Sequence, residues 1–308
     1  MTERAWDMLC RILWWGCACM AVGLLAVAFH YGYRALVSDT FVIPSDSMQP
    51  TLLAGDKVRV DKTIFGARLY TSLDFTDGQM ESIRTRGRRG LRHNDIVVFN
   101  YPVHEGRIGF KMNHVYVKRC LALPGDTISF VRSHPVNSHY RGTLGVPSGQ
   151  RMLEETPDSL MPGYAMRNIL VEWGVLGYTI KNIPPTYVPR KGDILRLDDW
   201  RKAEIYRRAI EWETGRTLAW DKEKAACLLD GEPLDYYRFR KNYYFMCGDH
   251  ALNSGDSRYW GFVPEEYIVG VVSEVVESVD PLTGRERKER RGMPLPDGEE
   301  KDGEGETI

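Results

Sequence analysis

The sequence lacks a charge imbalance, a disulfide framework and a metal-binding pattern. Its 308 residues have a formal net charge of −1, so they carry no basic excess of the kind that nucleic-acid binding requires. Three of its six cysteines lie in or beside an apolar N-terminal segment, and the odd remainder does not indicate a set of disulfides. One Cys-x-x-His pair, Cys247 and His250, has no second pair at zinc-site spacing. We therefore expect no nucleic-acid partner, no metal and no cofactor.

Charged residues are also absent from residues 12–33. About 20 apolar residues span a bilayer as a helix, and aromatic residues such as Trp14 and Tyr31 lie near the ends of this run. A cleavable signal peptide is the alternative, since residues 26–28 read Ala-Val-Ala. The length of the run favours a retained anchor over residues 1–36, and the positive-inside rule favours a cytoplasmic N-terminus.

After the anchor, the sequence is typical of a mainly β protein. Short β-rich runs, several of them following Gly-Asp turns, predict strands near residues 57–60, 95–99, 115–122, 127–131, 193–197, 242–246 and 267–276. One amphipathic helix is predicted that Asp198 and Asp199 can cap and Gly215 can end. We predict a β core over 37–130 and 242–280, and an inserted α+β subdomain over 131–241. A basic loop, residues 84–92, is expected to be solvated, with anionic lipid as the alternative partner. Residues 281–308 are rich in Gly, Pro and charge, which predicts a disordered tail.

The segment PSDSMQP, residues 44–50, holds two hydroxyls between two prolines. Each proline fixes its own φ angle and lacks an N–H donor, so the segment is a poor helix and a poor central strand. A stiff extended loop that presents Ser47 beside Ser45 is a suitable holder for a nucleophile. A serine hydroxyl is a weak nucleophile and needs an adjacent base.

Three segments resemble, in order, those of the bacterial type I signal peptidases, which are serine peptidases with a Ser-Lys dyad. They are the Ser47 segment, KRCLALPGD at residues 118–126, and GDHALNSGDSRYWG at residues 248–261. The resemblance implies an antiparallel β-sheet catalytic core of the signal-peptidase type, with Ser47 as nucleophile and Lys118 as general base. A lysine serves as base only when neutral, and the apolar neighbours of Lys118 predict a burial that lowers its pKa.

The resemblance also implies roles for residues around the dyad. Ser45 would contribute to the oxyanion hole, and Ser254 would orient Lys118. Arg119, Asp256 and Arg258 would support the site. The shallow pockets for small substrate side chains would be lined by Phe41, Ile43, Met48, Leu52 and Val117. His250 and Ala251 depart from the family pattern, in which Asn and Arg are common, and this is expected to change local support but not the dyad.

The resemblance implies a membrane-bound enzyme that removes signal peptides of the Ala-x-Ala type from exported preproteins. Its place would be the outer face of the bacterial inner membrane, in contact with lipid. Three alternatives stay open. One is a self-cleaving repressor, which the N-terminal span disfavours. Another is a Ser-His dyad with His114 or His250 as base, and a third is a membrane-tethered β domain that binds signal peptides without cutting them.

Overall fold

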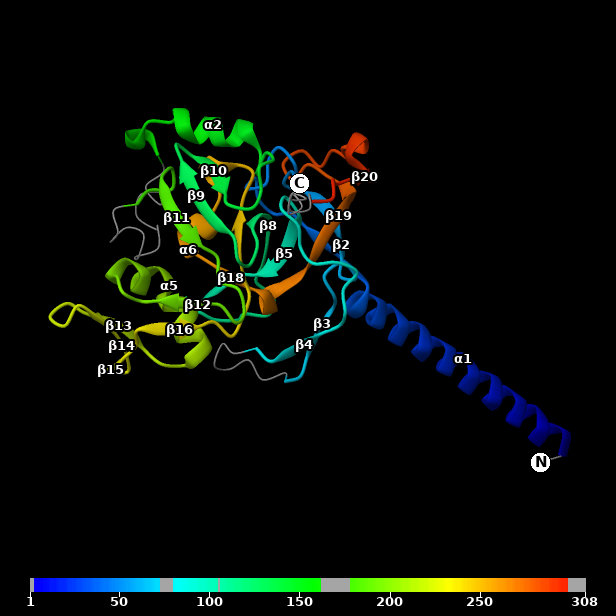
Figure 1. Cartoon of the computed structure of the whole chain (residues 1–308). Helices are drawn as coiled ribbons and strands as arrows, with labels where there is room; N and C mark the ends of the chain where they lie inside the picture. The colour runs from blue at the N-terminus through cyan, green and yellow to red at the C-terminus, as the bar shows by residue number, and fades with distance from the viewer. Residues whose placement is uncertain (1–2, 73–79, 105, 162–177, 299–308) are drawn as a thin grey trace, which may run out of the picture.

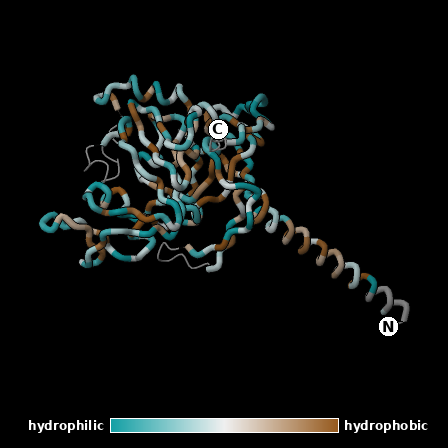
Figure 2. Tube along the Cα trace, viewed as in Figure 1, coloured by the Kyte–Doolittle hydropathy of each residue, from teal (hydrophilic) through white to brown (hydrophobic). Residues whose placement is uncertain are grey.

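The computed structural model describes residues 3–72, 80–104, 106–161 and 178–298. Its first element is the long helix α1 (Glu3–Leu36), which extends away from the body of the molecule in Figure 1. The part of α1 from Arg11 to Leu36 is long and apolar enough to cross a membrane, and its colouring in Figure 2 is mostly hydrophobic. The predicted single N-terminal apolar helix is therefore confirmed.

The body is built on one large antiparallel sheet. Its strands, in spatial order, are β1 (Ser38–Val42), β2 (Asp56–Asp61), β19 (Ile268–Ser278), β5 (Ile96–Asn100), β8 (Val115–Ala122), β17 (Tyr243–Cys247) and β18 (Val263–Pro264), with β20 (Met293–Pro294) paired to β19. Successive side chains of a strand point to opposite faces. Along β5, Val97 and Phe99 accordingly enter one core cluster while Ile96 and Val98 enter a second. The sheet is thus covered on both faces, and the mainly β prediction is confirmed.

The smaller sheets and the other helices surround this sheet (Figure 1). The small sheets are β10 (His134–Asn137), β9 (Thr127–Val131) and β11 (Ile183–Tyr187); β12 (Ile194–Arg196) and β16 (Tyr236–Arg238); β13 (Leu218–Asp221), β14 (Ala226–Leu229) and β15 (Glu232–Pro233); β3 (Arg68–Tyr70) and β4 (Ser82–Arg84); and β6 (Val103–His104) and β7 (Arg107–Ile108). The helices are α2 (Pro147–Glu155), α5 (Trp200–Thr214) and α6 (Ser257–Trp260), with 3-10 turns η1 (Asp158–Leu160), η2 (Ala251–Asn253), η3 (Glu265–Tyr267) and η4 (Lys288–Arg290).

Helix α5 begins and ends where the sequence predicts. The Asp199 carboxylate accepts a hydrogen bond from the backbone N–H of Arg201 at 3.0 Å, and Gly215 ends the helix with a φ of +69°. With α2, the strands β10 and β11 and the two sheets β12–β16 and β13–β14–β15, α5 makes up most of the described part of the predicted insertion. These elements lie on the side of the body away from α1 in Figure 1. The insertion's boundaries remain predictions.

The prediction of a disordered tail is wrong for residues 281–298. Arg290 pairs with the buried carboxylate of Asp56, and Met293 pairs with Val275 as part of strand β20. Leu295 is buried in the core cluster. Residues 281–298 are ordered with few apolar side chains, because the ion pair of Arg290 and the added strand β20 hold them against the body. The acidic end, 299–308, lies outside the described residues.

The basic loop is less solvated than expected. The guanidinium of Arg84 donates to the backbone oxygens of Gly66 and Ile268, at 2.7 and 2.8 Å, and Arg89 pairs with buried Asp95 at 2.7 Å. The run of basic residues could not predict these hydrogen-bond acceptors, because most of the acceptors lie far from residues 84–92 in the sequence.

Candidate active site

Ser45 and Ser47 lie on the loop that follows β1. Buried side chains of Ile43 and Met48 fix the loop on both sides of the two hydroxyls. The backbone N–H of Gln49 donates to the Asp46 carbonyl at 2.9 Å, which closes a turn around Ser47. The apolar side chains therefore enter the core, while Ser45 is exposed and Ser47 is half-buried.

Lys118 reaches Ser47 from the neighbouring strand β8. Its Nζ donates a hydrogen bond to Ser47 Oγ at 2.7 Å and another to the Val117 carbonyl at 3.1 Å. The lysine is only 2% exposed. The structure thus brings together the two residues predicted to form the dyad, although 71 positions separate them.

Burial lowers the pKa of Lys118 from 10.5 to about 8, and this effect is opposed in part by the carboxylates of Asp256 and Asp249. Desolvation disfavours the charged form of a lysine, which explains the direction. About half of the lysines are neutral at pH 8 and about a tenth at pH 7. A neutral amine at hydrogen-bond distance can take the proton from Ser47 Oγ.

The two other predicted serines behave differently. Ser45 Oγ donates to Ser47 Oγ at 3.4 Å, so it lies beside the nucleophile position. Ser254 Oγ is buried and has no hydrogen-bond partner among the described residues. It lies instead against Gly248, where a Cβ would come within 2.1 Å of Ser254 Oγ and 2.5 Å of the Ser47 carbonyl. No hydrogen bond of Ser254 Oγ among the described residues supports an orienting role for Ser254. That role therefore remains a prediction.

Asp256 and Arg258, two of the residues predicted to support the site, form an ion pair. Arg258 Nη2 lies 2.6 Å from Asp256 Oδ2, and both side chains are buried. The same guanidinium donates to the Ala251 carbonyl at 3.1 Å, while Asp256 accepts from the N–H of Gly248 at 3.0 Å. This pair holds the backbone of the third sequence segment next to the Ser47 loop.

A second network, of hydrogen bonds around Arg119, was predicted only in part. Arg119 donates to both carboxylate oxygens of Asp249, each at 2.7 Å, and Thr51 Oγ1 donates to Asp249 Oδ2 at 2.5 Å. The network joins β8, the Ser47 loop and the segment after β17. Asp249 follows a glycine in the third segment, but nothing in the sequence names Thr51 or Asp249 as partners of Arg119.

An open cleft of about 500 Å³ contains the serine and the lysine. Four of the five predicted pocket residues line it: Phe41, Ile43, Met48 and Val117. Leu52 does not line it, because this side chain is fully buried in the core cluster that also holds Ile43 and Met48. The predicted pocket is corrected by that one residue.

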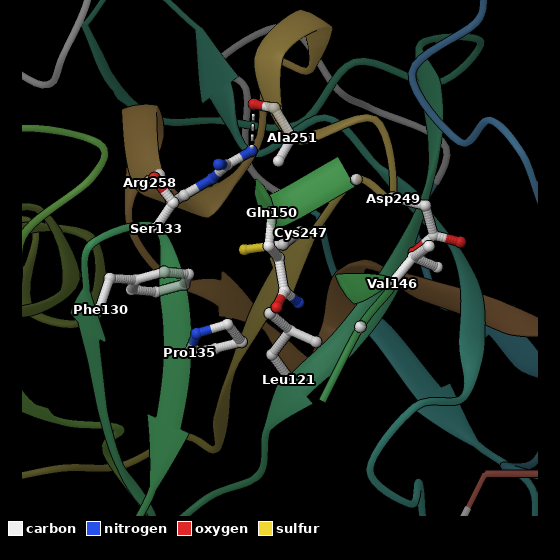
Figure 3. Close-up of a pocket in the computed structure, with 12 residues that line it drawn as sticks. Leu121, Phe130, Ser133, Pro135, Val146, Gln150, Cys247, Asp249, Ala251 and Arg258 are labelled. Atoms are coloured by element: carbon white, nitrogen blue, oxygen red, sulfur yellow. Dashed lines mark hydrogen bonds between the residues drawn. The ribbon is translucent and has the colours of Figure 1, made fainter. Parts of the chain in front are cut away.

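A small cavity of about 20 Å³ lies between the third segment and the predicted insertion (Figure 3). In this view Arg258 extends toward Ala251, and Gln150 of α2 faces the same space. Helix α2 approaches so closely that a Cβ at Gly149 would lie 2.1 Å from the Asp249 carbonyl. The described part of the insertion therefore packs directly against the segment that supports the site.

The side chains of the two candidate histidine bases have other neighbours, although His114 lines the same cleft as the dyad. The ring of His114 packs against that of Tyr101 at 5.0 Å, and His250 Nδ1 faces Asp46 Oδ2 at 3.3 Å. Burial lowers the pKa of His114. Lys118, by contrast, bonds Ser47 Oγ directly. Within the described residues, no three or more His, Cys, Asp or Glu side chains gather as metal ligands would.

The family model described as "Signal peptidase, peptidase S26" matches residues 15–149 and 180–277, which is most of the chain. The chain belongs to this family. It is a serine endopeptidase of the signal peptidase I type, which removes signal peptides. The matched residues include Ser47, Lys118 and the third segment, and they pass over 150–179 within the predicted insertion.

Curated signal peptidases agree with this assignment. The chain is 29% identical to signal peptidase I of Buchnera aphidicola subsp. Baizongia pistaciae over 254 residues, which cover 78% of this chain and 69% of the relative. It is 26% identical to that of Aquifex aeolicus over 297 residues, covering 89% and 95%. With signal peptidase I of Pseudomonas aeruginosa it shares 27% over 247 residues, covering 77% and 64%.

Proposed function

We propose that Ser47 is the nucleophile and Lys118 the general base of this signal peptidase, which cuts preproteins after small residues. The single observation that carries the proposal is the 2.7 Å hydrogen bond between Ser47 Oγ and the buried Lys118 Nζ. The lowered pKa of Lys118, about 8, supports it, because the amine is neutral in a useful fraction of molecules near neutral pH.

The reaction runs through an acyl-enzyme. Neutral Lys118 takes the proton of Ser47 Oγ as the oxygen attacks the carbonyl carbon of the scissile bond. The oxyanion is stabilised by Ser45 Oγ and the backbone N–H of Ser47. Lys118 then gives its proton to the leaving amine of the mature protein. Water, deprotonated by Lys118, attacks the ester, and Lys118 passes that proton to the departing Ser47 Oγ. The signal peptide is freed with a new carboxyl terminus. No cofactor takes part in this sequence.

The cleft favours an extended peptide with small side chains at the positions that enter the pockets. It runs between the end of β1 and the start of β8. Strand β1 pairs with β2, and β8 pairs with β17 only from Arg119 onward in the described structure. Backbone groups at both edges are thus placed to bond an added strand. The apolar walls formed by Phe41, Ile43 and Val117 leave room for residues such as alanine.

The helix α1 serves as a retained anchor in this proposal. Its N-terminus lies in the cytoplasm, and the catalytic body lies on the outer side of the bacterial inner membrane. Exported preproteins are the substrates and membrane lipid is the surrounding partner. The apolar character of α1 and the short stretch of chain between its end at Leu36 and Ser47 support this placement.

The test is cleavage of a preprotein with an Ala-x-Ala site in detergent by the full chain, Ser47→Ala and Lys118→Met. Both variants are expected to lose about 10⁴-fold or more in rate, as removal of a nucleophile or base does elsewhere. Folding of each variant is checked by thermal unfolding. Activity that survives Lys118→Met moves the base to a histidine. A folded wild type that cuts nothing favours the binding domain instead.

A further inference from the structure

A second cleft opens where the anchor helix joins the catalytic body. It has a volume of about 530 Å³ and is lined by residues from the last turn of α1, from β1 and from the hairpin strand β3. Phe41 and Val115 line both this cleft and the one that contains Ser47. The two clefts are therefore neighbours, although the second contains no residue of the dyad.

Positive charge is in excess in this second cleft. Arg34, Lys62 and Arg68 line it, and among the described residues that line it Asp39 is the one carboxylate. Arg34 Nη2 pairs with Asp39 Oδ1 at 2.9 Å, whereas Lys62 Nζ lies 3.9 Å from Asp39 Oδ2. One carboxylate cannot neutralise three cations, so the cleft attracts an anion.

The cations are held in place by the fold. The Lys62 side chain is 12% exposed, and its Nζ donates to the carbonyl of Arg34 at 2.6 Å. Arg68 donates to Asn100 Oδ1 at 2.8 Å and to the Glu266 carbonyl at 2.9 Å. Burial lowers the pKa of Lys62, and repulsion by Arg68 and Arg34 adds to this against the attraction of Asp39. A bound anion would relieve that repulsion.

The position of the cleft indicates which anion it meets. Helix α1 ends at Leu36, two residues after Arg34. With α1 spanning a bilayer, Arg34 lies at the level where hydrocarbon gives way to headgroups. The cleft also has an apolar lining, which includes Leu69 and the 40% exposed Met112. Cations beside apolar side chains at this depth match a phosphodiester joined to its glycerol and acyl chains.

We propose that this cleft binds the headgroup phosphate of an anionic glycerophospholipid, held by Lys62, Arg34 and Arg68. The proposal rests on the membrane placement of α1 given above. Because the cleft shares Phe41 and Val115 with the substrate cleft, the lipid sits beside the bound peptide. It fixes the end of the anchor against the body.

Native mass spectrometry of the full chain in a non-ionic detergent tests the site directly. Short-chain phosphatidylglycerol and phosphatidylcholine are titrated against the wild type, Lys62→Gln, Arg34→Gln and the matched control Lys57→Gln. Lys57 lies at the far end of β2 and pairs with Glu277. We expect a preference for phosphatidylglycerol in the wild type, and about fivefold weaker binding in Lys62→Gln and in Arg34→Gln. Lys57→Gln is expected to bind like the wild type.

Three results would overturn the proposal. The first is equal binding of the two lipids by the wild type, and the second is an equal loss in Lys57→Gln, which would mean general surface charge. The third is inorganic phosphate binding as tightly as the lipid, which would make the ligand a soluble anion. Weak competition by phosphate at millimolar concentration supports the site, because the shared group is then the phosphate.

A peptide assay separates this proposal from the peptidase mechanism. In detergent without anionic lipid, Lys62→Gln should cleave a soluble Ala-x-Ala peptide at the wild-type kcat/KM. A raised KM under these conditions would assign the cleft to the substrate and would reject the lipid. Lipid binding is measured without turnover, so failure of the Ser47-Lys118 mechanism would leave its outcome unchanged.

Discussion

Charged residues are used in opposite ways in the active site and in the described part of the predicted insertion. Around Ser47, the side chains of Lys118, Arg119, Asp249, Asp256 and Arg258 are all buried. In the insertion, pairs such as Arg216 with Asp230 and Lys202 with Asp198 are about half-exposed. The buried side chains of the active site have lost their hydration and depend on their protein partners, whereas the exposed pairs of the insertion remain hydrated.

This difference shows that the active site accepts the desolvation of charged groups because its function requires them. A buried ion pair is not in itself a strong source of stability, because desolvation offsets much of the attraction. Within the described residues, the hydrogen-bond acceptors of the Lys118 amine are Ser47 Oγ and a backbone carbonyl, and neither is a carboxylate. An amine that is costly to charge is what a general base requires. The exposed pairs of the insertion should be nearly neutral for stability, and the following experiments test this contrast.

The largest effect is expected from Arg258→Met. This change leaves the Asp256 carboxylate buried without its cation, which should destabilise the fold by about 3–5 kcal/mol. Thermal unfolding of the full chain in detergent measures the loss. The double variant Asp256→Asn with Arg258→Met removes both charges and should lose less than the single one. If the stability of Arg258→Met lies within about 1 kcal/mol of wild type, the difference between buried and exposed ion pairs is contradicted.

The pH dependence of cleavage should follow Lys118. Its pKa is lowered to about 8, and only the neutral amine acts as a base. The kcat/KM value for an Ala-x-Ala peptide should therefore be about half-maximal at pH 8 and fall about tenfold per unit below pH 7. His250→Gln serves as the control and should keep this profile. An inflection that disappears in His250→Gln would make the histidine the base.

Lys118→Met should be inactive yet more stable than wild type at pH 7, by about 3 kcal/mol. The pKa of Lys118 is about 8 in the folded chain against 10.5 for an unperturbed lysine. Below pH 8 the lysine is charged in both states, but charging it is harder in the folded state. Between pH 8 and 10.5 the folded form loses its proton first, so wild type gains stability there. Unfolding measured at pH 7 and pH 10 should show the difference shrinking, and a less stable variant at pH 7 would refute it.

The smallest effect is expected from Arg216→Gln in the insertion. Arg216 Nε pairs with Asp230 Oδ2 at 2.8 Å, but both side chains are about half-exposed. Water replaces the lost partner, so the change in stability should stay within about 0.5 kcal/mol. The same unfolding assay checks it. A loss comparable to that of Arg258→Met would remove the distinction between the two regions.

Local pattern was enough to predict the main elements. Strands β8 and β9 begin and end at the predicted residues, because each is a short β-rich run and a Gly-Asp turn separates them. Helix α5 was predicted from its cap, its apolar spacing and its terminal glycine. These signals act within a few residues, so one sequence is sufficient to read them.

Contacts between distant segments were predicted only where the family pattern supplied them. The pairing of Ser47 with Lys118 came from that pattern, and no spacing rule would have indicated it. The bonds of Thr51 and Arg119 to Asp249 join residues 198 and 130 positions apart. The family resemblance assigned Leu52 to the pocket, but an apolar residue near a site fits a pocket wall and a core equally well. Only the packing around its side chain decides between them.

The joint between anchor and body leaves the enzyme little freedom to move. One residue, Val37, separates the end of α1 from the start of β1. Its N–H continues the helical bonding to the carbonyl of Tyr33, and Lys62 braces the Arg34 carbonyl from the body. In the membrane placement that we propose for α1, Ser47 is held at a set height above the bilayer. A signal peptide is then cut only where its own membrane span brings the scissile bond to that height.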